Sequence, residues 1–156
     1  MTFDGDSDID TRSSLHVGLT PENLAAVSGR WPRTAATPSG VASLLAESRR
    51  LFVGASQSYD NFVAAPLKAL QAADLALKLR VGLPAEDKRT MGKVIEYERE
   101  VHPVLNDYRR QWYSEFALHY RNMLSHPKES IAFGAGLSAP IVQSVHETVA
   151  ELFPDS

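Results

Sequence analysis

Apolar residues recur at three- and four-residue spacing along most of this chain, and that spacing predicts helices. From Ser39 to Gly82 the sequence is rich in Ala and Leu, so we expect helix throughout. Pro66 should kink this helix or divide it, because proline removes a backbone hydrogen bond, and Gly82 should end it. The apolar positions are Leu44, Leu45, Leu51, Phe52, Ala55, Tyr59, Phe62, Val63, Leu67, Leu70, Leu75, Leu77 and Leu79.

Three more helices follow in the pattern. The first is short and is capped by Thr90, the second is long and opens near Pro103, and the third begins at Ser138. No stretch keeps the two-residue period of a strand for long, so the predicted fold class is all-α, a bundle of four to five helices. The long helix carries Leu105, Tyr108, Trp112, Phe116, Tyr120 and Met123 on one side, and the last helix repeats Ile141, Val145, Val149 and Leu152.

Residues 1–38 are rich in Asp, Ser, Thr, Gly and Pro and have little apolar periodicity, which is typical of a flexible tail. One short helix is expected within it, with Thr20 as the N-cap, Pro21 at the first helical position and Gly29 as the stop. The sequence therefore predicts a tail over 1–38 and a helical bundle over 39–156.

Composition narrows the function classes. At 156 residues the chain fits one domain, and its net charge of −3 does not indicate non-specific nucleic-acid binding. The absence of cysteine excludes disulfides, thiolate metal sites and cysteine nucleophiles. The acidic start, MTFDGDSDID, does not resemble a signal peptide, and no apolar run is long enough for a membrane span, so we expect a cytoplasmic protein without membrane contact.

Familiar catalytic and metal motifs do not fit. The stretch TMGKV lacks the first glycine and the hydroxyl of a phosphate-binding loop, and no H-E-x-x-H or repeated Glu-x-x-His is present. We therefore expect no metal and no cofactor. His16 falls in the tail, His102 precedes a helix, and surface or half-buried positions are expected for His119 and His146.

The stretch HYRNMLSHPK, residues 119–128, places several polar side chains at one helix end. Pro127 disfavours helical geometry at the residue before it, so His126 should leave the helix and turn back toward Arg121. Asn122 and Ser125 would then lie beside them. A helix cap also explains this pattern, because cations are favoured near C-terminal carbonyl groups.

The spacing Arg121-Asn122-x3-His126 resembles the R-x4-6-H motif of the HEPN superfamily. The resemblance extends over about residues 40–153, because HEPN domains are all-α bundles with this motif near the end of a late, long helix that follows an Ala/Leu-rich one. It implies a HEPN-like bundle, and in catalytic members a metal-independent ribonuclease with a dimeric composite site.

The residues suit that chemistry. The planar guanidinium of Arg121 matches phosphate oxygens, and His126 exchanges a proton near neutral pH. Asn122 would position one of these groups, with Ser125 as a lesser candidate for the same task. A two-fold homodimer would supply two histidines, one as base and one as acid.

Other charged residues are candidates for supporting roles. Arg109, Arg110 and Lys128 would guide RNA to the motif, although a solvated surface accounts for them equally well. Asp74 and Lys78, four residues apart, should pair with each other, either facing the motif and supporting its residues from behind or as a plain surface pair.

Three functions remain open from the sequence. The first is a HEPN ribonuclease that acts as a toxin or in phage defence, with RNA as substrate and an antitoxin or other regulatory partner. HEPN targets of a nucleotidyltransferase antitoxin typically carry a tyrosine two residues after the histidine, where this chain has Lys128, and this departure disfavours that pairing. The second is a non-catalytic HEPN-fold module that binds RNA, nucleotide or protein. The third is an all-α regulatory domain whose motif is only a helix cap.

Overall fold

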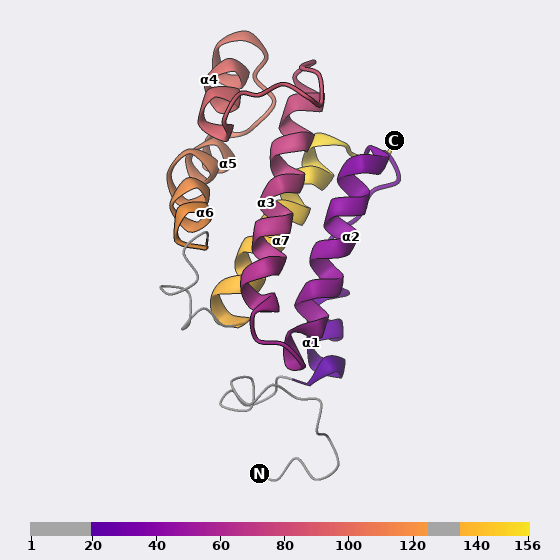
Figure 1. Cartoon of the computed structure of the whole chain (residues 1–156). Helices are drawn as coiled ribbons and strands as arrows, with labels where there is room; N and C mark the ends of the chain where they lie inside the picture. The colour runs from indigo at the N-terminus through magenta and orange to yellow at the C-terminus, as the bar shows by residue number, and fades with distance from the viewer. Residues whose placement is uncertain (1–19, 125–134) are drawn as a thin grey trace, which may run out of the picture.

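The structure is a computed structural model and describes residues 20–124 and 135–156. Every regular element in these ranges is helical (Figure 1), which confirms the all-α class. A 3-10 turn, η2 (Gly54–Ser56), follows the second helix, and a π-helix, η3 (Trp112–Ala117), joins the fifth to the sixth. The α-helices are α1 (Pro21–Ser28), α2 (Ser39–Val53), α3 (Asn61–Arg80), α4 (Met91–Val101), α5 (Asp107–Gln111), α6 (Leu118–Leu124) and α7 (Ala135–Leu152).

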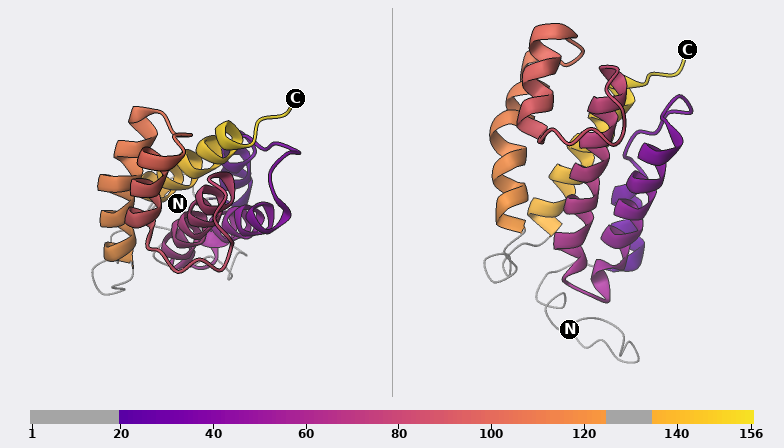
Figure 2. Two further views of the ribbon diagram at one scale, coloured as in Figure 1. Left: turned by 90° about the horizontal axis from the view of Figure 1, so that it is seen from above. Right: turned by 45° about the horizontal axis from the view of Figure 1, so that its top comes forward.

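The helices form two groups on either side of the central pair α3 and α7. Helices α1 and α2 lie on one side of this pair, and α4 to α6 lie on the other (Figures 1 and 2). We call residues 91–124, which comprise α4, α5, η3 and α6, the arm. Helix α3 buries five alanines, whose small side chains let α2 and α7 pack closely against it. These alanines are Ala65, Ala69, Ala72, Ala73 and Ala76.

Local chemistry sets several helix ends where the sequence predicts them. The Thr20 hydroxyl accepts the Asn23 N–H at 3.1 Å, and the Thr90 hydroxyl caps α4 in the same way. After α3, Gly82 adopts a φ of 83°, and the Leu83 N–H donates to the Lys78 carbonyl at 2.8 Å. This is a Schellman ending, in which glycine takes the left-handed position at little energetic cost.

The first long helical stretch divides earlier than Pro66. Pro66 lies inside α3, whereas the chain turns between α2 and α3 at residues 54–60. A Cβ on Gly54 would lie 3.0 Å from the side-chain amide nitrogen of Asn61, so glycine permits the close approach of the two helices. Ser56, Ser58 and Asp60, all frequent in turns, fill the connection. The break therefore follows turn chemistry and not the proline.

Residues 20–38, which were predicted to belong to a flexible tail, are packed against the bundle. Helix α1 forms as expected, but Leu24 and Trp31 are each only 3% exposed and belong to the core. The Trp31 ring lies 5.0 Å from the ring of Phe52 on α2. Burial of large apolar side chains therefore fixes residues 20–38 to the bundle. Residues 1–19 lie outside the described residues.

The side of the arm that is buried differs from the side that the apolar pattern predicts. Leu105 is buried as expected, but Tyr108 is 65% exposed and Phe116 is 49% exposed. The buried positions after Leu105 are instead Arg109, Tyr113 and Ala117, spaced four apart. Because a π-helix bonds residue i to i+5, its wider turn keeps residues four apart close to one face.

Candidate functional site

The predicted motif begins on α6, at the end of the arm. Arg121 and Asn122 are adjacent on this helix, and both have exposed side chains. Ser125, His126 and Lys128 lie outside the described residues, so the convergence of His126 with Arg121 stays a prediction. The described part of the motif therefore presents a guanidinium and an amide at the surface.

A buried carboxylate fixes the start of the helical run that leads to the motif. Glu98 on α4 is fully buried and accepts N–H groups from Val104 at 2.8 Å and Leu105 at 2.9 Å. Arg110 donates two further bonds to it, each 2.8 Å long. Burial raises the pKa of Glu98, but the Arg110 and backbone donors outweigh burial and hold this pKa below its ordinary value.

A second ion pair ties the arm to α7. The Arg109 side chain is 8% exposed and donates to Glu147 and to Glu151, at 3.0 Å in each case. Hydrogen bonding to Glu151 raises the pKa of Arg109 above its ordinary value; burial opposes this effect, and the bond to Glu147 adds to it. Arg109 is therefore a structural cation with acidic partners from a helix about 40 positions away in sequence.

These two ion pairs bear on the expected guidance of RNA. Arg109 and Arg110 were candidates for RNA contact, but their guanidinium groups are bound to carboxylates inside the protein. A phosphate would therefore compete with carboxylates that already neutralise both guanidinium groups. The geometry gives both residues a role in positioning the motif helix and gives no support to direct RNA contact by either.

One side of the arm carries a row of aromatic residues, Tyr108, Trp112, Phe116 and Tyr120, which we call the aromatic stripe. Trp112 and Tyr120 are half-buried, while Tyr108 and Phe116 are exposed. A pocket of about 190 Å³ lies between this stripe and the first half of α7, where Leu137 is 46% exposed. Apolar surface therefore borders the helix that carries Arg121.

The predicted pairing of Asp74 with Lys78 is confirmed. The Lys78 ammonium nitrogen lies 2.8 Å from Oδ2 of Asp74, and the Lys78 side chain is only 8% exposed. The pair is thus largely buried on α3 and is not a surface pair. The other carboxylate oxygen, Oδ1, is buried and accepts no hydrogen bond from the described residues. Whether this pair faces the motif stays a prediction.

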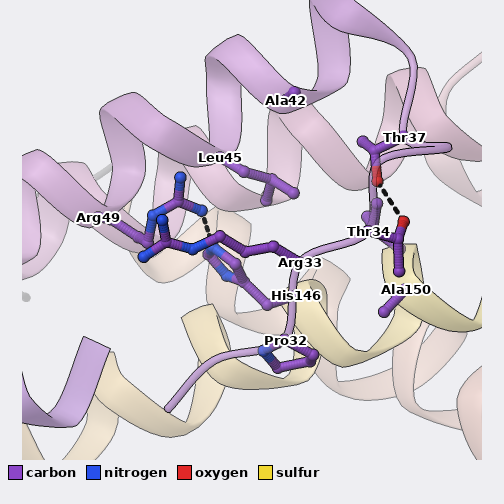
Figure 3. A pocket seen from close by; sticks show the side chains of 10 residues that line it. Pro32, Arg33, Thr34, Thr37, Ala42, Leu45, Arg49, His146 and Ala150 are labelled. Carbon is purple, nitrogen blue, oxygen red and sulfur yellow. Dashed lines mark hydrogen bonds between the residues drawn. The ribbon is translucent and has the colours of Figure 1, made fainter. Parts of the chain in front are cut away.

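A histidine expected at or near the surface is instead at the centre of another polar cluster (Figure 3). His146 on α7 is fully buried, and its Nε2 lies 2.9 Å from Nη1 of Arg49 on α2. Its Nδ1 lies 2.9 Å from the Val142 carbonyl oxygen. Because arginine and a carbonyl have fixed roles, Nδ1 donates and Nε2 accepts, which defines a neutral ring. Burial lowers the pKa of His146 to about 4, and the nearby Arg49 and Arg33 act in the same direction.

Sequence reasoning did not find this cluster, although one signal was present. His146 falls between Val142, Val145 and Val149 on the most regular apolar repeat in the chain, so it shares the buried face of its helix. A histidine at such a position needs buried hydrogen-bond partners. Its partner Arg49 lies 97 positions away, and no local pattern indicates it.

The fold and these contacts define the chain as an all-α helical protein with an exposed Arg-Asn pair at one helix end and a buried Arg-His pair elsewhere. No protein-family model, no curated protein and no solved structure matches it.

Proposed function

We propose that the protein is a metal-independent ribonuclease of HEPN type that acts as a homodimer. The observation that carries the proposal is the exposure of Arg121 and Asn122 on adjacent positions of the last described turn of α6. This turn lies late in an all-α bundle, as the R-x4-6-H resemblance requires. A buried Arg121 would have contradicted the proposal.

The proposed reaction is cleavage of RNA by its own 2'-hydroxyl group. His126 takes the proton of this hydroxyl, its oxygen bonds to the phosphorus, and the bond from phosphorus to the 5'-oxygen breaks. The partner's His126 gives a proton to that leaving oxygen. Arg121 stabilises the negative charge on the phosphate oxygens, and Asn122 positions the phosphate or the histidine.

The aromatic stripe supports the homodimer in this proposal. Tyr108 and Phe116 are large, exposed and located on the arm that carries Arg121. Exposed aromatic residues are typical of protein interfaces, and a two-fold axis beside the arm would bring two motifs to one cleft. Phe116→Asp should therefore shift the mass in light scattering from dimer to monomer. Val101→Asp, which changes an exposed apolar residue of α4 outside the stripe, is the matched control.

One observation favours the second candidate, a non-catalytic HEPN-fold module that binds RNA, nucleotide or protein. Arg109 and Arg110, the arginines nearest the motif on the arm, are held in internal ion pairs, and the net charge of the chain is −3. Strong attraction of an RNA backbone requires several unpaired cations. A binding partner held mainly by apolar contacts with the aromatic stripe would not depend on such cations.

Cleavage of single-stranded RNA by the purified protein in EDTA distinguishes the two candidates. Removing a charged donor typically slows a reaction about 10² to 10³-fold and removing a general acid or base about 10² to 10⁴-fold, so Arg121→Ala and His126→Ala should each abolish visible cleavage. Asn122→Ala should retain some activity. Matched controls are His119→Ala, an exposed histidine on the same helix, and Arg50→Ala, whose side chain is 71% exposed on α2.

The products and the cellular effect give further tests. Wild-type protein should leave 2',3'-cyclic phosphate ends, and RNA with a 2'-deoxy sugar at the cleaved position should resist. If the protein is a toxin or defence protein, expression should arrest growth, and His126→Ala should relieve the arrest. Absence of cleavage by a folded wild-type protein, or inhibition by EDTA, would replace the ribonuclease with the binding module.

A further inference from the structure

A pocket on the other side of the α3–α7 pair has the composition of a ligand site. It has a volume of about 220 Å³ and lies between α2, α7 and the segment of residues 32–37 (Figure 3). No residue of the arm lines it, so it shares nothing with the proposed ribonuclease site. Its walls combine aliphatic side chains, among them Leu45 and Val149, with two arginines.

The charged side chains that line this pocket are all positive. Arg33 and Arg49 both line it, and no aspartate or glutamate does. Figure 3 shows the two side chains extending toward the same region beside His146. Burial lowers the pKa of Arg49, and repulsion by Arg33 lowers it further. Neither arginine forms an ion pair with a carboxylate in the described part of the chain. Two neighbouring guanidinium groups without an acidic partner favour an anion between them.

The pocket is also held in shape before any ligand arrives. His146 uses both ring nitrogens, one on the Val142 carbonyl and one on Arg49, so it fixes the direction of that guanidinium. The Trp31 ring closes the other side of His146, with ring centres 5.1 Å apart. The wall formed by residues 32–37 is anchored because the Ala35 N–H donates to Asp155 at 2.8 Å. Preorganisation of this kind lowers the entropic cost of binding.

We propose that this pocket binds a small organic anion. Its carboxylate or phosphate group would lie between the guanidinium groups of Arg33 and Arg49, and its apolar body would pack on Leu45 and Val149. The pocket volume equals that of about seven water molecules, which suits a body of about six to ten non-hydrogen atoms. Both guanidinium groups can hold a planar carboxylate or a phosphate through paired bonds.

Titration of the isotope-labelled full chain, followed by amide NMR shifts, tests this proposal. The probes are hexanoate, hexyl phosphate, neutral hexanamide and inorganic phosphate. Hexanoate or hexyl phosphate should bind saturably and shift amides of residues 32–37, α2 and the second half of α7. Hexanamide and inorganic phosphate should each bind at least about tenfold more weakly, since one lacks the charge and the other lacks the apolar body.

Three variants locate the binding. Arg33 is exposed, so Arg33→Ala should fold normally and should weaken binding of the alkyl anion about tenfold or more. Arg49→Gln removes the charge but keeps a polar side chain, and it should weaken binding similarly. Arg50→Ala removes the neighbouring arginine, which does not line the pocket, and should bind as wild type does.

Several results would overturn the proposal. One is the absence of saturable binding by both alkyl anions. Equal binding of hexanoate and hexanamide would show that the arginines do not recognise charge. Equal binding of inorganic phosphate and the alkyl anions would show that the apolar walls do not contribute to binding. Unchanged affinity in Arg33→Ala and Arg49→Gln would place the anion elsewhere. Loss of RNA cleavage in these experiments has no bearing on the pocket, because the two sites have no residue in common.

Discussion

Replacing Glu98 should destabilise the whole protein, because this one carboxylate joins α4, the following turn and α5. The side chain is fully buried and accepts four short hydrogen bonds, two from backbone N–H groups and two from Arg110. Glu98→Ala removes all four acceptor contacts at once. Glu98→Gln keeps the shape but places an amide donor against either Arg110 or the backbone donors.

The structure sets the size of the effect. The Leu105 N–H is buried, so leaving it without an acceptor costs about 1 to 3 kcal/mol. Arg110 loses two charge-assisted bonds but keeps the Leu105 carbonyl and Asp107, and it is 18% exposed, which limits its penalty. We therefore expect Glu98→Ala to lower the free energy of unfolding by about 3 to 5 kcal/mol and Glu98→Gln by about half as much.

Urea unfolding followed by circular dichroism at pH 7 measures this loss. With a slope of about 2 kcal/mol per molar urea, Glu98→Ala should lower the midpoint by about 1.5 to 2.5 M without changing the slope. Glu100→Ala removes an exposed glutamate from the same helix and should change stability by less than about 0.5 kcal/mol. If Glu98→Ala does not fold, the comparison uses Glu98→Gln.

A loss below about 1 kcal/mol in Glu98→Ala would refute the reasoning, since it would mean that water replaces the carboxylate at no cost. The pH dependence gives a second check. The folded pKa of Glu98 is lower than its ordinary value, so its contribution is fully present above the unfolded pKa and is lost as the pH falls through the folded pKa. A contribution that is instead lost above pH 5 would contradict this assignment.

Three further predictions concern stability. His146 has a folded pKa of about 4 against an ordinary 6.5, so its contribution is complete above about pH 6.5 and falls by about 3 kcal/mol as the pH drops to 4; His146→Gln should remove this slope from urea midpoints measured across that range. Arg109→Met keeps the buried stem but loses the ion pairs, and because Glu151 is half exposed we expect thermal unfolding to show a loss of only about 1 to 2 kcal/mol, with Glu151→Gln losing less than about 1. Gly82→Ala strains a left-handed position and should destabilise by about 1 kcal/mol, whereas Gly136→Ala adds a good helix former in open space within α7 and should be neutral or stabilising, as differential scanning calorimetry can show.

The elements that sequence predicted correctly depend on local chemistry. Thr20 and Thr90 cap their helices through the N–H three residues later, and Gly82 ends α3 because only glycine adopts its backbone geometry readily. The apolar repeat of α7 is buried as expected, at Ile141, Val145, Val149 and Leu152. In each case the decisive contacts lie within one or two turns of the chain.

The features that the sequence did not indicate depend on contacts between distant segments. Trp31 lies in a polar stretch of sequence, but the rings of Phe52 and His146, from distant segments, pack against it. Arg109 looks like a surface cation because Glu147 and Glu151 lie on another helix. The pocket at Arg33 and Arg49 is built from three segments, so no spacing within one segment could indicate it. The motif at Arg121 is the opposite case, because its sequence pattern is local while the geometry that tests it lies beyond α6.

The choice of which residues the arm buries connects the fold to the proposed function. Only part of the aromatic stripe packs on the bundle, because Trp112 and Tyr120 are half-buried against the core and border a pocket with α7. Arg109 adds ion pairs from the arm to α7, Arg110 pairs with Glu98 within the arm, and Tyr108 and Phe116 remain exposed. The ion pairs that hold the arm to α7 therefore involve other residues than the exposed aromatics that we propose for association of two copies. It follows that Phe116→Asp should change the oligomeric state with little effect on folding, whereas loss of the Arg109 ion pairs should change folding and leave the stripe available to a second copy.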